Sequence, residues 1–108
     1  MTIAASRHVA RIVSIAVLAF APFAGPSAAA DAQNGERLAR RWCASCHLVA
    51  PDQRQAGEAA PFAAIARPGF NEAQLAFYLL TPHPRMPDMD LTRAEAADLA
   101  AYIVGLGR

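Results

Sequence analysis

Five consecutive residues carry most of the chemistry in this 108-residue chain: Cys43-Ala44-Ser45-Cys46-His47, a C-x-x-C-H run. Two thiols at this spacing can add to the two vinyl groups of one haem, and the adjoining histidine can then supply a nitrogen to the iron. The spacing matters because both sulfurs must reach the same edge of one planar ring while the imidazole points at its centre. The run predicts one covalently attached haem c per chain.

Three other uses of the two cysteines are open alternatives. A thioredoxin-like dithiol would make the protein a thiol oxidoreductase, but such a pair normally lies between a strand and a helix, and no strand pattern is present. A zinc site needs four ligands, and beyond His47 only His83 offers a nitrogen after residue 30. A plain disulfide leaves His47 without a role.

A six-coordinate haem needs a ligand on its other face, and three residues are candidates: Met86, Met89 and His83. Met86 is favoured because it lies between two prolines in the segment Thr81–Leu91. Prolines fix the backbone and keep their predecessors out of the helical region, so this segment is expected to be stiff and extended. A thioether is a weak ligand that such a loop would hold in place.

The first thirty residues have the pattern of a secretory signal peptide. Arg7 and Arg11 precede an apolar run at 12–24, and small residues follow, which predicts cleavage after Ala30. An uncleaved anchor is the alternative, but the apolar run of about 13 residues is shorter than the roughly 20 that a spanning helix needs. We therefore expect residues 1–30 to be removed, export to the periplasm, and a domain at 31–108 without a membrane span.

Charge and size limit what this domain can do. Residues 31–108 contain eight arginines, no lysine and nine acidic residues, so the strongly basic face of a nucleic-acid-binding protein is not expected. A domain this small buries little apolar surface and usually needs a metal, a disulfide or a cofactor. A haem would serve as part of the core.

The hydrophobic pattern predicts an all-α domain. Asn34, Asn71 and Thr92 are expected as helix N-caps, and Thr92 begins a capping-box pattern. Prolines and glycines end the helical stretches. The expected helices span about 33–44, 71–80 and 92–105, with one further helical turn within 61–67.

Residues 33–108 resemble a class I c-type cytochrome. The resemblance rests on the C-x-x-C-H run, on Gly35 eight residues before Cys43, on the methionine loop, and on the pair Leu99 and Tyr102 in the last helix. It implies the cytochrome c fold, with three to four helices wrapped around one covalently attached haem. It also implies that the first and last helices cross at Gly35, with Leu99 and Tyr102 packed over the contact.

The resemblance assigns the remaining site residues. It implies that Cys43, Cys46, His47, Met86 and Pro61 bind the haem, with the Pro61 carbonyl accepting the Nδ1 proton of His47. Axial ligation by His47 and Met86 leaves the iron no open position for a substrate, so we expect a periplasmic electron-transfer protein and not an enzyme.

The expected partners are an electron donor and an electron acceptor, met by a monomer or by a subunit of a complex. Two functional alternatives keep the fold. One is a dedicated cytochrome subunit of an exported dehydrogenase or other oxidoreductase complex. The other is a ligand-binding haem sensor or peroxidase-like enzyme in which Met86 is displaced.

Overall fold

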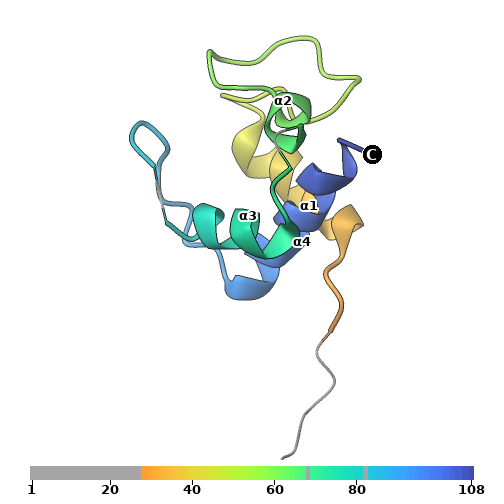
Figure 1. The fold of residues 1–108 in the computed structure, drawn as a ribbon. Helices are drawn as coiled ribbons and strands as arrows, with labels where there is room; N and C mark the ends of the chain where they lie inside the picture. Colours follow the sequence, from red (N-terminus) through yellow and green to blue (C-terminus); the bar gives the residue numbers. More distant parts are fainter. Residues whose placement is uncertain (1–27, 68, 82) are drawn as a thin grey trace, which may run out of the picture.

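The computed structural model describes residues 28–67, 69–81 and 83–108, and the described part is helical (Figure 1). No strand occurs among these residues, which confirms the all-α expectation. Residues 1–27 of the expected signal peptide lie outside the described part. The elements are α1 (Ala32–Leu38), the π-helical turn η1 (Ala39–Cys43), α2 (Phe62–Ala66), α3 (Glu72–Leu79) and α4 (Arg93–Gly105).

The centre of the fold is the crossing of α1 and α4. Gly35 is buried there, and a Cβ at this position would collide with the backbone carbonyl of Asp98 and lie 2.9 Å from Cβ of Tyr102. Only glycine allows the two backbones to approach this closely. Leu99 is fully buried beside the crossing and Tyr102 is half-buried. The close approach expected at Gly35 is therefore confirmed.

The core around this crossing is small and made largely of short side chains. The largest fully buried side chains are Leu99, Ile103 and Val49, and Phe62 and Leu75 are almost as deeply buried. Alanines fill the remaining interior positions where helices meet. So few large buried side chains leave the described domain dependent on something else to complete its interior.

The helix caps agree with the sequence in two of three cases. Asn71 and Thr92 both form capping boxes at the starts of α3 and α4. The expected cap at Asn34 is wrong, because the Asp31 carboxylate accepts the backbone N–H groups of Gln33 and Asn34 at 2.9 and 3.1 Å. Aspartate is as good a cap as asparagine and occurs three residues earlier, so α1 begins at Ala32.

Asn34 has a different role, which ties α1 to α4. Its side-chain amide donates to the Asp98 carboxylate at 2.8 Å, and the Asp31 backbone N–H donates to the other oxygen of the same carboxylate at 2.7 Å. Asp98 thus fastens the first turn of α1 to the middle of α4.

A π-helical turn joins α1 to the cysteine-containing segment. The backbone N–H of Ala44 donates to the carbonyl of Ala39, five residues earlier, at 3.1 Å. The wider turn ends at Cys43, whose side chain is buried, while the preceding Trp42 is 43% exposed. π-helical turns occur often at functional sites, and hydrophobic periodicity gives no signal for them.

Candidate haem site

A cavity of about 680 Å³ opens between the C-x-x-C-H segment and the loop that joins α3 to α4. This loop, light blue in Figure 1, projects from the helical body. The volume lies within the range usual for sites that bind small molecules and cofactors. The wall is mainly apolar and is lined by the cysteine segment (Trp42, Cys43, Ser45, Cys46, His47), by Glu58, Ala59, Ala60, Ile65, Phe70, Leu75 and Tyr78, and by the loop residues His83, Pro84, Arg85, Met86, Pro87 and Met89.

Both cysteine side chains lie on the cavity wall as free thiols. Cys43 is buried and Cys46 is exposed. Burial, followed by the nearby Cys46, raises the pKa of the Cys43 thiol to about 11. Reactive redox cysteines need a lowered pKa, so this environment does not suit a dithiol oxidoreductase. Both sulfurs instead border a mainly apolar cavity with room for a cofactor.

The zinc alternative also lacks support. Among residues 28–67, 69–81 and 83–108, no cluster of three or more His, Cys, Asp or Glu side chains could hold a metal ion. In the described part of the chain, the two thiols and the adjacent imidazole are therefore not arranged as a zinc site.

His47 is oriented by a backbone hydrogen bond. Its Nδ1 lies 2.6 Å from the carbonyl oxygen of Ala60, and since a carbonyl only accepts, Nδ1 is the protonated nitrogen. The other ring nitrogen, Nε2, keeps its lone pair for a metal. A partner of this kind fixes the ring and strengthens it as a ligand. The Phe62 ring packs against the imidazole, with ring centres 5.3 Å apart.

The expected hydrogen bond from His47 to the Pro61 carbonyl is wrong by one residue. The Pro61 carbonyl faces into α2 and accepts the backbone N–H groups of Ala64 and Ile65 at 2.9 and 3.1 Å. A carbonyl committed to the first turn of a helix points along that helix, so the residue before it accepts from His47 instead. Pro61 does not line the cavity and is the N-cap of α2, directly after the residue that accepts from His47.

All three candidates for the opposite ligand reach the cavity. Met86, Met89 and His83 line it together, and each is half-buried. Met86 and His83 also line a smaller adjoining pocket beside Leu75 and Ile103, deeper in the core. The loop thus brings a thioether to the cavity that His47 also lines.

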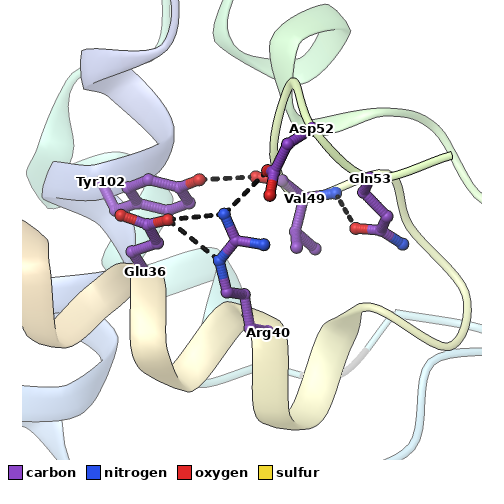
Figure 2. Close-up of polar contacts among 6 residues, drawn as sticks. All are labelled: Glu36, Arg40, Val49, Asp52, Gln53 and Tyr102. Carbon is purple, nitrogen blue, oxygen red and sulfur yellow. Dashed lines mark hydrogen bonds and ion pairs between the residues drawn. The ribbon is translucent and has the colours of Figure 1, made fainter.

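Gln53 holds the cysteine segment in shape, and sequence reasoning missed it. Its side-chain amide nitrogen donates to the carbonyls of Ala44, His47 and Gln55 at 2.9, 3.0 and 2.8 Å, and its oxygen accepts the Val49 N–H at 2.9 Å. Figure 2 shows the contact with Val49. One side chain therefore fixes both ends of the haem-attachment segment. A single glutamine in a polar loop gives no sequence signal of such a role.

Two further contacts fasten the segment after His47 to the helices (Figure 2). The Tyr102 hydroxyl of α4 donates to the Val49 carbonyl at 2.7 Å. Arg40 contacts Glu36 and Asp52, each at 2.8 Å, which lowers the pKa of the Asp52 carboxyl through its hydrogen bond with the guanidinium. Arg40 thereby links η1 to this loop.

Comparison with known proteins agrees with the geometry. Residues 30–103 match the family described as cytochrome C oxidase, cbb3-type, subunit III. Cytochrome c-552 of Bradyrhizobium diazoefficiens is 53% identical over 92 residues, which cover 83% of this chain and 88% of that protein. No solved structure matches the chain significantly.

The fold, the site and these matches define a class I c-type cytochrome, and the chain belongs to this family. It carries one covalently bound haem c, attached through the C-x-x-C-H motif of Cys43, Cys46 and His47. The residues present fit that group: two sulfurs and one imidazole with a free Nε2 face a single apolar cavity. The protein is a haem electron-transfer cytochrome.

Proposed function

We propose that this cytochrome is a periplasmic electron carrier, released by cleavage after Ala30, with His47 and Met86 as the two axial ligands. The observation that supports it best is that both cysteines, His47 and Met86 line one cavity. The bound haem supplies a one-electron exchange between ferric and ferrous iron. With both axial positions filled by protein, no position is left for a substrate, and no catalytic residue is proposed.

The protein groups around the iron set how it exchanges that electron. The Ala60 carbonyl holds His47 in one tautomer and one orientation. The soft sulfur of Met86 favours the ferrous state and raises the reduction potential, as does the apolar wall that excludes water. Electrons would pass to redox partners at the edge near Cys46, which is exposed, through small and transient contacts.

Export is proposed on the leader pattern of residues 1–30 alone. Within residues 28–67, 69–81 and 83–108, no helix combines the length and apolar character required to cross a bilayer. Cleavage after Ala30 would leave Asp31, the cap of α1, as the first residue.

The ligand assignment is tested by a matched pair of variants, Met86→Ala and Met89→Ala. Both residues are half-buried loop methionines on the same cavity wall. Met86→Ala should leave the haem attached, abolish the weak red sulfur-to-iron charge-transfer band and lower the midpoint potential, while Met89→Ala should retain both properties. Loss of the band in Met89→Ala alone would move the ligand to Met89.

A second candidate function follows from the matched family. Its description names a subunit of an oxidase, which favours a dedicated cytochrome subunit of an oxidoreductase complex. Purification of the tagged protein from the membranes and the periplasm of the cells that produce it distinguishes a free carrier from a subunit. A free carrier elutes alone as a monomer, whereas a subunit elutes in constant ratio with a larger redox enzyme.

A further inference from the structure

The backbone that presents Met86 is a tight turn with an unfavourable residue in it. The Met86 N–H donates to the His83 carbonyl at 3.0 Å, Pro84 occupies the second position, and Arg85 has a φ of +74° at the third. This is the pattern of a type II turn, in which the third position favours glycine. A side chain such as that of Arg85 makes the left-handed conformation costly.

A second left-handed residue lies at the other end of the same segment. Asp90 has a φ of +50°, and its N–H donates to the Asp88 carboxylate at 3.0 Å. Segment 86–89, with both loop methionines, thus lies between two non-glycine residues of positive φ. Such conformations persist only where surrounding contacts hold them, and they concentrate at functional sites.

The contact that can hold the turn is made by the side chain of His83. Its ring stacks on the Tyr78 ring of α3, with ring centres 5.4 Å apart and an interplanar angle of 23°. Its Nδ1 lies 3.0 Å from the Pro84 carbonyl oxygen. One imidazole therefore connects the first residue of the turn both to a helix and to the turn itself.

We infer that His83 is a positioning residue, whose stacking on Tyr78 holds the strained turn that presents the Met86 sulfur to the haem iron. The inference rests on the proposed ligation by Met86. Without the stack, the turn relaxes away from the left-handed conformation at Arg85, and Met86 is no longer held against the cavity. His83 then governs how firmly the methionine stays bound, without itself contacting the iron.

The test compares His83→Ala with His83→Phe in the haem-loaded protein. Phenylalanine keeps an aromatic ring for the stack but has no nitrogen to bind iron. The measurement is the rate at which added imidazole displaces the methionine from the ferric protein, followed by loss of the sulfur-to-iron charge-transfer band. We expect displacement about tenfold faster in His83→Ala and within about twofold of the parent rate in His83→Phe, since a stacked aromatic pair contributes an effect of this order.

Two more variants separate positioning from a general loss of stability. Tyr78→Leu removes the other ring of the stack, should accelerate displacement like His83→Ala, and should add little when combined with it. Arg85→Gly removes the cost of the positive φ and should slow displacement at least about threefold in the His83→Ala background. Denaturant unfolding of the same variants is the check, because a general loss of stability would change the displacement rate in step with the free energy of unfolding, whichever residue is replaced.

The outcomes distinguish failure of this inference from failure of the ligand assignment. Equal displacement rates in His83→Ala, His83→Phe and the parent, or equally accelerated rates in both variants, would overturn the positioning role while Met86 remains the ligand. Loss of six-coordination in both His83 variants, with no change in Met86→Ala, would instead make His83 the ligand and overturn the proposed ligation as well.

Discussion

The two sides of the haem cavity are held in place by different means. The attachment side, with Cys43, Cys46 and His47, is fixed by hydrogen bonds that Gln53 donates and by the one that His47 donates to the Ala60 carbonyl. Tyr102 and Arg40 fasten the following loop to the helices. The methionine side, residues 83–89, is fixed by prolines, one turn hydrogen bond and the stack of His83 on Tyr78, with a left-handed residue at Arg85.

This difference indicates that the attachment side is rigid and that the methionine side can change conformation more easily. The hydrogen bonds of Gln53 to the Ala44 and His47 carbonyls are part-buried, and breaking them leaves unpaired backbone groups behind. The stacked ring at the surface and the turn of positive φ stabilise the methionine side less than these hydrogen bonds stabilise the attachment side. We therefore expect disturbances of the attachment side to damage folding, and those of the methionine side to change ligand exchange while the fold survives.

The largest effect should follow removal of both attachment points. In Cys43→Ala combined with Cys46→Ala, the small core cannot close over a cavity of about 680 Å³, so we expect loss of cooperative folding. Circular dichroism during thermal unfolding measures this. Ser45→Ala, an exposed residue of the same segment, is the control and should melt like the parent protein. A cooperatively folded haem-free variant would show that the attachment side does not depend on the cofactor.

The second-largest effect should follow disruption of the helix crossing that supports the attachment side. Gly35→Ala places a Cβ against the Asp98 carbonyl and should lower the free energy of unfolding by about 3 kcal/mol. Gly105→Ala is the matched control, because a Cβ there meets nothing within 4 Å, and it should leave stability unchanged or slightly raised. Denaturant unfolding checks both variants, and equal stabilities would contradict close contact of α1 and α4.

Gln53→Glu tests whether the attachment side and the methionine side respond independently. Glutamate keeps the shape but turns the donor toward three carbonyls into an acceptor, which should cost about 2 kcal/mol of unfolding free energy. The rate at which imidazole displaces the methionine should stay within about twofold of the parent rate, because the hydrogen bonds of the Gln53 side chain all go to the cysteine segment and to its own loop. Gln55→Glu, at an exposed position of the same loop, is the control. A much faster displacement in Gln53→Glu would show that the two sides are coupled.

The smallest effect should appear at alkaline pH. Burial raises the pKa of the Tyr102 hydroxyl above its usual value of 10.0. The unfolded chain then releases this proton first as the pH rises, so the contribution of Tyr102 is present below about pH 10 and is lost as the pH passes through the folded pKa. Tyr102→Phe should lower stability by about 1 kcal/mol at neutral pH through loss of the bond to Val49 and should flatten the alkaline decline. If the stability of Tyr102→Phe declined at alkaline pH as steeply as that of the parent, the decline would come from other titrating groups.

Local signals in the sequence predicted the helices well. Capping residues at Asn71 and Thr92 and the short pattern after Pro61 placed three of the helices within a residue or two. The cap of the first helix was wrong because Asp31 and Asn34 are both good caps, and only the contact with Asp98 on α4 decides between them. The π-helical turn at Ala39–Cys43 follows from tertiary packing and has no local pattern.

For the haem site, the sequence predicted the residues that bind the haem but not the contacts that hold those residues in place. The C-x-x-C-H run is a local motif whose chemistry follows from its spacing. The hydrogen bond from His47 depends on which carbonyl before α2 faces the ring, and α2 itself uses that of Pro61. The roles of Gln53, Tyr78 and His83 arise from contacts of loop side chains with other loop or helix residues, and no residue pattern in the sequence shows these contacts.

The central claim is that one haem, attached through Cys43 and Cys46, forms the interior of this domain between the two sides compared above. The most direct test is the intact mass of the exported protein under denaturing conditions. The account predicts the mass of residues 31–108 plus one covalently bound haem, which remains attached after acid and organic solvent. A mass without an added tetrapyrrole would contradict it.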